Sequence, residues 1–296
     1  MNIPVTLVVE KYYLLRILKI RKEIRKLNPD VVLSFLEGAN FICEMAGLPC
    51  RKWKLIVGER SSNPNILKSF KLKFFRWAHF FADAIVSNSF ENIKMIQKVN
   101  PLISSDKCHV IYNIVNFENF NFEKNFTPRK NGKFQLLIAS NHQYLKNAKN
   151  VVEGLNLLPQ TYKNLLVIHW YGRKDSAEVV EPYKEAQLLV EKYNLVNQLK
   201  FFDPIPSINE IILNYDALGL FSLHEGLPNS ICEGMASGKP IIATNVSDNK
   251  FLINHNKSGI LVDGFEAKNI RDSLMKLLDL SDKKLLDMGK ISYEIA

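Results

Sequence analysis

Short apolar runs alternate along the chain with longer stretches in which apolar residues return every three or four positions. Three such runs, at 31–35, 54–58 and 84–87, predict short buried strands in the first part of the chain. The stretch before them has helical spacing and predicts a helix that stops at Asn28 and Pro29; its apolar positions are Ile17, Ile20, Ile24 and Leu27. Strands that alternate with helices indicate parallel sheets with helices on both faces.

A second alternating series follows position 133. It predicts strands at 134–139, 165–170, 199–202, 217–222, 240–244 and 260–262. Between and after these strands, the spacing of apolar residues predicts helices at 147–158, 176–194, 207–214, 229–238 and 266–279. The second half of the chain is therefore expected to form its own parallel sheet.

The two series are separated by 113–132, a stretch rich in asparagine that has no clean period and ends in Pro128 and Gly132. We therefore predict an N-terminal domain at 1–116, a linker at 117–132 and a C-terminal domain at 133–296. The predicted fold class is α/β, with two doubly wound, Rossmann-like domains that face a cleft.

The net charge of +9 lies entirely in the first domain. Residues 1–116 contain 18 Lys and Arg against 9 Asp and Glu, whereas the remaining residues contain 21 of each kind. This asymmetry indicates an anionic partner for the first domain, either phospholipid headgroups or a phosphorylated substrate. Nucleic acid is the generic competitor, but the basic half lacks a helix-turn-helix or ribonucleoprotein signature, so we expect no nucleic acid.

The cysteines show neither a CxxC pair nor metal-ligand spacing with histidine, which favours free thiols in a reducing cytoplasm. No apolar run reaches the roughly 18 residues of a membrane span, and the pattern of a signal peptide is missing. The expected location is therefore the cytoplasm. No Asp-x-Asp pattern occurs and the histidines are scattered, so we expect no metal site and no cofactor.

The segment 215–240 carries the chemistry. A buried strand is followed by a loop with Gly226 and Pro228, and then by a helix that starts near Asn229. Loops at the carboxyl ends of strands bind ligands in open α/β sheets, and a helix N-terminus suits a diphosphate. Glu225 in the loop and Glu233 in the helix could meet a sugar and a ribose diol, respectively.

Two simpler interpretations compete with this one. Ser230 and Glu233 have the Ser-x-x-Glu spacing of a capping box, so Glu233 could cap its own helix. Glu225 could be a solvated loop acid. The combination of both glutamates with the glycine- and proline-containing turns around them favours the binding site.

The pattern Glu-Gly-Leu-Pro at 225–228 followed by Glu-Gly-Met-Ala-Ser-Gly-Lys-Pro at 233–240 resembles the signature of glycosyltransferase family 4, also called glycosyl transferases group 1. These are retaining enzymes with the GT-B fold. The resemblance extends over nearly the whole chain, through segments at 29–32, 82–89, 110–113, 259–262 and 267–278.

The resemblance implies a role for each matching residue. Glu225 is expected next to the donor sugar, and Lys146, which could otherwise be a solvated lysine, next to the diphosphate; both would be catalytic. Glu233 would hold the ribose. Asn141 stands where many members carry an arginine, for which Arg173 would compensate. The backbone amides that would contact sugar and diphosphate belong to Gly226, Leu227, Pro228, Asn229 and Ser230.

The function implied by the resemblance is that of a hexosyltransferase. Such an enzyme moves a sugar from a nucleotide-diphosphate donor to a saccharide or lipid-linked acceptor, with retention, in cell-surface polysaccharide assembly. No paired nucleophile and acid is evident, so stabilisation of the leaving diphosphate is expected to drive the reaction.

Compared with the family pattern, the chain is expected to lack the opening strand and Gly-rich loop of the N-terminal domain and to stop before the usual final crossing segment. An N-terminal domain incomplete in this way would hold the acceptor poorly. The alternative function is therefore a catalytically weak or inactive nucleotide-sugar-binding subunit, or a relic of such an enzyme.

Two features of the first domain remain. Glu59 and Arg60 follow a predicted strand and are expected to border the cleft, although they could simply pair with each other in a loop. The stretch 68–81 is basic and aromatic. It could rest on an anionic membrane, which would make the protein peripheral at the inner face of the plasma membrane, or it could be a core helix with a solvated basic face.

Overall fold

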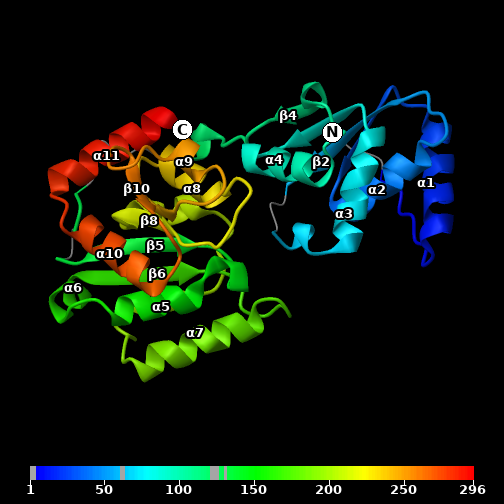
Figure 1. Ribbon diagram of the computed structural model, residues 1–296. Coiled ribbons are helices and arrows are strands. Elements are labelled where there is room, and N and C mark those ends of the chain that lie inside the picture. Colours follow the sequence, from blue (N-terminus) through cyan, green and yellow to red (C-terminus); the bar gives the residue numbers. More distant parts are fainter. Residues whose placement is uncertain (1–4, 61–63, 121–126, 130–131) are drawn as a thin grey trace. The chain divides into compact units, whose positions relative to one another are not determined.

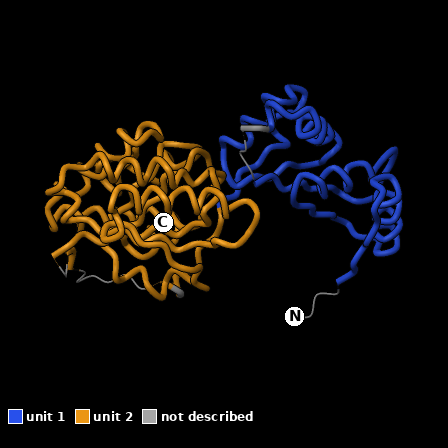
Figure 2. Tube along the Cα trace, turned by 90° about the horizontal axis from the view of Figure 1, so that it is seen from below, with its two compact units in different colours: residues 1–112 blue, residues 113–296 orange. Residues whose placement is uncertain are grey.

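The computed structural model describes the 296-residue chain except for residues 1–4, 61–63, 121–126 and 130–131. The chain forms two compact units, Met1–Tyr112 and Asn113–Ala296, which are coloured separately in Figure 2. The division falls at 112, slightly before the boundary at 116 that the sequence predicts. Each unit is an α/β domain built on one parallel sheet.

Unit 1 contains helices α1 (Tyr13–Leu27), α2 (Glu37–Ala46), α3 (Phe70–Trp77) and α4 (Phe90–Val99). Its strands are β1 (Val31–Phe35), β2 (Lys54–Glu59), β3 (Ala84–Ser87) and β4 (Cys108–Val110). Short 3-10 turns occur at η1 (Pro64–Leu67), η2 (Ala78–Phe81) and η3 (Ser105–Lys107). The three strands predicted in this half are β1, β2 and β3, and the predicted N-terminal helix is α1.

The strands of unit 1 lie in the order β1-β2-β3-β4, all parallel. Because strand order follows chain order, right-handed crossovers bring α2, α3 and α4 to one face of the sheet. On that face Leu55, Val57 and Ile85 pack with Ile93 and Ile96 of α4. The other face of β1 carries side chains that are about half exposed, namely Val31, Leu33 and Phe35.

Unit 2 contains helices α5 (Ala148–Asn156), α6 (Gln160–Leu165), α7 (Val180–Lys192), α8 (Asn229–Ala236), α9 (Asn249–Leu252), α10 (Ala267–Leu278) and α11 (Asp282–Ile295). Its strands are β5 (Phe134–Ala139), β6 (Leu166–Tyr171), β7 (Leu199–Phe202), β8 (Ala217–Leu220), β9 (Ile241–Thr244) and β10 (Gly259–Val262). The 3-10 turns are η4 (Phe117–Asn119), η5 (Tyr144–Lys146), η6 (Ile208–Glu210) and η7 (Ile212–Asn214).

The parallel sheet of unit 2 has the order β10-β9-β8-β5-β6-β7. The chain leaves β5 towards β6 and β7, and then crosses over to begin again at β8 on the other side of β5. Helices α5, α7 and α10 cover one face, and α8 with η6 and η7 covers the other (Figure 1). The pair β5 and β8 is therefore the topological switch point, where open α/β sheets bind ligands.

One predicted helix of unit 2 is wrong. Residues 207–214 form the two 3-10 turns η6 and η7 instead of a single helix. Ile208 and Ile212 are buried at helical spacing, which explains the prediction. The backbone at Ile211, between the turns, has φ −124° and ψ −20°, which no helix accommodates. β-branched isoleucines in so short a segment favour this break.

The predicted linker is attached to unit 2 at Arg129. The backbone N–H of Arg129 donates to Asp216 Oδ1 at 2.8 Å, and its guanidinium donates to the carbonyl oxygens of Leu278 and Leu280. Linker positions 121–126 and 130–131 lie outside the described residues.

Candidate active site

The candidate site lies at the carboxyl ends of β5 and β8. The loop after β5 ends in η5, which carries Lys146, and the loop after β8 carries Glu225. The backbone N–H of Leu223 donates to the carbonyl oxygen of Leu145 at 2.8 Å and joins the two loops. The switch point thus brings together residues that are 79 positions apart in the sequence.

Lys146 and Glu225 form an ion pair, in which Nζ donates to Oε1 of the carboxylate. The same Oε1 accepts a hydrogen bond of 2.6 Å from Ser222 Oγ, at the end of the β8 segment. The side chains of Lys146 and Glu225 are only 15% and 11% exposed. Neither is therefore a solvated loop residue.

Helix α8 presents its first turn beside this loop. Its N-cap residue is Pro228, which supplies no side-chain cap to the backbone N–H groups that follow. These N–H groups and the positive end of the helix suit a diphosphate. Asn229 and Ser230 are already helical, so the capping box between Ser230 and Glu233 is wrong: Ser230 stands inside the helix rather than before it.

Glu233 lies on α8 with its side chain partly buried. Burial raises the pKa of its carboxyl group above the ordinary value. A partly desolvated carboxylate gains from any donor that approaches it, because hydrogen bonds to a charged group are stronger where water is excluded. The two hydroxyls of a ribose are such donors.

The loop between β8 and α8 is held by polar residues that sequence reasoning missed. Ser247 Oγ donates to the carbonyl oxygen of Gly226 at 3.0 Å, and Thr244 Oγ1 donates to that of Ser222 at 2.6 Å. Asn113 Nδ2 donates to Asn229 Oδ1 at 2.5 Å. These partners are separated from the loop by up to 116 positions, so only the fold reveals them.

Leu227 and Pro228 have buried side chains, so only their backbone can face a ligand, and Pro228 has no N–H group to donate. The structure brings Asn141 and Arg173 together: the backbone N–H of Arg173 donates to the side-chain Oδ1 of Asn141 at 3.1 Å. Both side chains are otherwise exposed. The loops after β5 and β6 are therefore joined at this point.

His142, next to Asn141, is fully buried, and both of its ring nitrogens lack a hydrogen-bond partner in the part of the chain that the structure describes. Its ring packs against Trp170, Tyr183 and Phe201 at centroid distances of 5.2, 5.0 and 5.1 Å. Burial, with a contribution from Lys174, lowers the pKa of His142 to about 4. A neutral, aromatic His142 thus anchors the start of the loop that carries Lys146.

The structure places Glu59 in the interior of unit 1, with 2% of its surface exposed. Its carboxylate accepts hydrogen bonds from Arg76 Nη2 at 2.8 Å and from His79 Nε2 at 3.2 Å. His79 Nδ1 lies 2.6 Å from Glu44 Oε1. We call Glu44, Glu59, Arg76 and His79 the buried polar cluster. Arg60 is exposed beside it, and Glu59 pairs with Arg76 rather than with Arg60 in a loop.

The members of the buried polar cluster set each other's charge. Burial alone would lower the pKa of His79, but its hydrogen bonds to Glu44 and Glu59 outweigh burial and raise it to about 9. Burial would raise the pKa of Glu59, yet His79 and Arg76 lower it overall. Burial dominates at Glu44 and raises its pKa. His79 is therefore protonated at neutral pH, and Glu59 is ionised.

Across the described ranges, no group of three or more His, Cys, Asp or Glu side chains is arranged to hold a metal ion. None of the helices described is both long and apolar enough to cross a membrane.

Comparison with known protein families assigns the chain to a family. Residues 119–295 match the family model of glycosyl transferases group 1, and residues 4–119 match that of glycosyltransferase family 4. The chain therefore belongs to this glycosyltransferase family, as the motif at 225–240 predicts.

The D-inositol 3-phosphate glycosyltransferase of Corynebacterium diphtheriae is 29% identical over 137 residues, which cover 45% of this chain and 31% of that protein. The chain thus spans about a third of the length of such relatives. An N-acetylgalactosaminyltransferase of Campylobacter jejuni, named for a diphospho-undecaprenol-linked substrate, is 23% identical over 283 residues, covering 90% of this chain and 72% of that protein.

Solved structures confirm the GT-B fold. Anabaena HepE in complex with UDP and glucose superimposes with a TM-score of 0.81 at 16% identity, over 95% of this chain and 76% of that one. Sucrose-phosphate synthase from Thermosynechococcus elongatus superimposes with a TM-score of 0.79 at 14% identity, over 99% and 76% of the two chains. At these identities the likeness concerns the fold.

Proposed function

We propose that this protein is a retaining glycosyltransferase that moves a hexose from a nucleoside-diphosphate donor to a saccharide or lipid-linked acceptor, in the assembly of a cell-surface polysaccharide. Family membership supports the reaction class. The names of relatives support the substrate classes, since one is named for a diphospho-undecaprenol-linked acceptor and HepE was solved with UDP and glucose.

The observation that carries the proposal is the Lys146–Glu225 pair at the switch point of unit 2, one loop away from the first turn of α8. Departure of a nucleoside diphosphate develops negative charge on its oxygens. A mostly buried ammonium group and the N–H groups of α8 would stabilise that charge without reorganising during the reaction. Glu233, in the same helix, would accept hydrogen bonds from the ribose hydroxyls.

Glu225 would keep Lys146 in place before the donor binds and would then lie next to the transferred sugar. Ser222 holds the carboxylate in one orientation through its 2.6 Å hydrogen bond. We also propose that turnover needs no divalent metal, because Lys146 and the helix amides supply the positive charge. Adding EDTA to the assay should leave the rate unchanged, and a loss of rate restored by Mg²⁺ or Mn²⁺ would contradict this part.

We further propose that α3 rests on an anionic membrane at the cytoplasmic side. Phe70 is 85% exposed and Phe74 is 52% exposed, although Phe75 and Arg76 on the same helix are buried. The exposed lysines around them are Lys68, Lys71 and Lys73. Aromatic rings with interspersed lysines are typical of helices at the headgroup level of a membrane. This contact would bring the enzyme to a lipid-linked acceptor.

The reaction is tested by incubating the full chain with UDP-, GDP- and ADP-linked hexoses and either free saccharides or polyprenyl-diphosphate saccharides. We expect acceptor-dependent release of one nucleoside diphosphate and a product with the anomeric configuration of the donor, read by NMR. Donor binding without transfer to any acceptor would point to a nucleotide-sugar-binding subunit instead. Failure to bind any donor would overturn the proposal.

The membrane contact is tested separately by sedimentation with vesicles of phosphatidylglycerol and phosphatidylcholine. The variant Phe70→Ser/Phe74→Ser should bind anionic vesicles much more weakly than the wild type. Phe251→Ser, at an exposed aromatic residue of unit 2, is the matched control and should bind as the wild type does. Equal binding by all three proteins would exclude α3 as the docking helix.

A further inference from the structure

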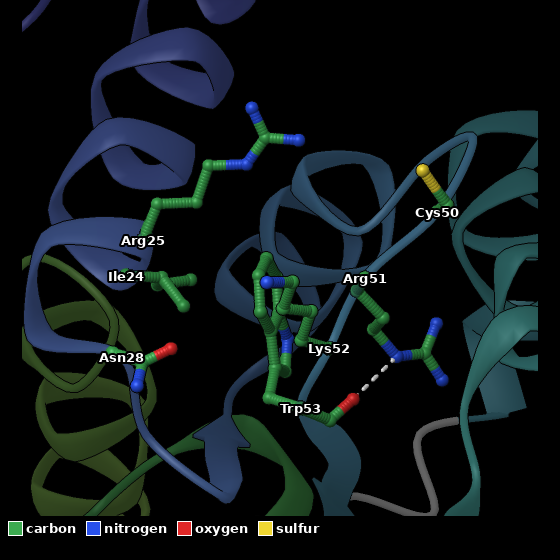
Figure 3. A pocket seen from close by; sticks show the side chains of 7 residues that line it. All are labelled: Ile24, Arg25, Asn28, Cys50, Arg51, Lys52 and Trp53. Carbon is green, nitrogen blue, oxygen red and sulfur yellow. Dashed lines mark hydrogen bonds between the residues drawn. The ribbon is translucent and has the colours of Figure 1, made fainter.

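A cavity lies in unit 1, far along the chain from the residues of the candidate active site. It has a volume of about 390 Å³ and lies between the end of α1 and the segment that precedes β2. Its lining residues are Ile24, Arg25, Asn28, Cys50, Arg51, Lys52 and Trp53 (Figure 3). Because β1 and β2 both start after these segments, the cavity lies at the amino edge of the sheet. Glu59, at the carboxyl end of β2, is at the opposite edge.

The lining of the cavity is strongly basic. Arg25, Arg51 and Lys52 are cationic, and none of the described residues that line the cavity is acidic. Arg51 is held in place, since Nε donates to the carbonyl oxygen of Trp53 at 3.1 Å and Nη2 donates to Asp83 at 2.5 Å. Figure 3 shows the first of these hydrogen bonds and the side chain of Arg25 reaching from α1. Asp83 offsets one positive charge, so the surroundings stay cationic and suit an anion.

The remaining wall is apolar and contains one unusual polar atom. The indole ring of Trp53 is 5% exposed, and its Nε1 is buried without a hydrogen-bond partner among the described residues. A buried N–H group without an acceptor costs free energy, so most such groups find one. Ile24 packs in the same wall. The cavity therefore combines cations for an acidic group with an apolar surface for an organic group.

The charge of the sequence points to the same place. Residues 1–116 carry the entire net charge of the chain, and the membrane contact proposed for α3 uses only part of that excess. Seven of the 18 basic residues lie on the last turns of α1 or at 51–54, namely Arg21, Lys22, Arg25, Lys26, Arg51, Lys52 and Lys54. An anionic partner of unit 1 would thus meet a cluster of positive charge at and around this cavity.

We propose that this cavity binds a phosphate-bearing ligand with a small organic group, the phosphate lying between Arg25 and Lys52 and the organic group against Trp53. Its volume of about 390 Å³ holds a headgroup-sized molecule. The same chemistry is offered by a soluble phosphate ester and by the headgroup of an anionic phospholipid.

The test uses the full chain and two probes. Glycerol 3-phosphate is titrated in solution by calorimetry, and vesicles of phosphatidylglycerol or phosphatidylcholine are tested by sedimentation. The variant Arg25→Gln/Lys52→Gln removes two exposed cations of the cavity without disturbing a described ion pair. Lys94→Gln/Lys98→Gln, with the same loss of charge on α4, is the matched control. Lys146→Gln controls for phosphate that binds at the candidate active site.

We expect the wild type and both controls to bind at least one probe, and the cavity variant to bind it at least tenfold more weakly. Loss of glycerol 3-phosphate binding identifies a soluble ligand, and loss of phosphatidylglycerol binding alone identifies a lipid headgroup. Binding of neither probe by the wild type, or equal binding by wild type and cavity variant, would overturn the proposal.

Discussion

Lys146 donates a hydrogen bond to the carboxylate of Glu225, and this ion pair joins the loop after β5 to the loop after β8. The carboxylate thereby balances the charge of the ammonium group and orients it before any donor binds. A diphosphate that enters the site competes for the same ammonium group. Removing Lys146 should therefore lower the affinity for the donor, whereas removing the carboxylate of Glu225 should maintain or raise it.

Glu225→Gln should bind UDP at least as tightly as the wild type, because Lys146 loses its competing anion. The same variant should transfer sugar at least tenfold more slowly, because the carboxylate next to the transferred sugar is lost. Calorimetry and the transfer assay measure the two effects. A fall in UDP affinity with an unchanged transfer rate would contradict the role of Glu225. Glu178→Gln, a glutamate of unit 2 that pairs with Gln143, serves as control.

Glu233→Ala should weaken UDP binding by about 1–3 kcal/mol, the scale of hydrogen bonds lost from a charged group. The loss should disappear with 2′,3′-dideoxy-UDP, which lacks both ribose hydroxyls, and with pyrophosphate, which lacks the ribose. Ser230→Ala should unfold like the wild type, because no capping box forms. Equal losses for UDP and dideoxy-UDP would mean that Glu233 acts on the helix and not on the ribose.

Acid should destabilise unit 2 through His142. Its pKa is lowered to about 4 from the ordinary 6.5, so the unfolded state binds the proton first as the pH falls. The contribution of neutral His142 to the stability of unit 2 is present above pH 6.5 and is lost as the pH falls from 6.5 to 4. The loss is about 3 kcal/mol at most. His142→Phe keeps the aromatic packing and should flatten this part of the profile. Urea unfolding between pH 4 and 7 measures the free energy of unfolding of the wild type and of His142→Phe. If the two proteins lose stability in parallel as the pH falls, His142 is not the titrating group.

His79→Ala should destabilise unit 1 by about 3–5 kcal/mol, because it leaves Glu44 and Glu59 buried without their shared partner. His109→Ala, at an exposed histidine of β4, should change stability by less than about 0.5 kcal/mol. Thermal unfolding followed by near-UV circular dichroism compares the two variants. Similar melting temperatures for both would mean that the buried polar cluster contributes little.

Local patterns predict the strands and the loop motif well. The runs at 31–35, 84–87, 134–139 and 199–202 are strands within the same bounds, because strands buried in parallel sheets are short and almost wholly apolar. The motif with Glu225 and Glu233 is also local, since strand end, loop and helix start follow one another in the chain. The resemblance of this motif to a known family then assigns the rest of the site.

Long-range contacts are not predictable in this way. Lys146 is assigned by resemblance alone, and its contact with Glu225 follows only from the strand order that places β5 beside β8. The positions of Glu44, Glu59 and His79 in the sequence follow no period that would predict their contact. The sequence therefore predicts Glu59 at a cleft, whereas the structure places it in the interior of unit 1. The isoleucines of 207–214 have helical spacing, but the backbone at Ile211 breaks the helix.

The central claim is that Lys146 carries the charge of the donor diphosphate at the switch point of unit 2. The most direct measurement is the calorimetric titration of UDP into the wild type, Lys146→Gln and Lys149→Gln. Lys149 is three residues further on, in an exposed ion pair with Glu185, and is the matched control. We expect Lys149→Gln to bind UDP as the wild type does and Lys146→Gln to lose about 1.5–3 kcal/mol, the scale of a hydrogen bond to a charged group. Equal UDP affinity in all three proteins would contradict the claim.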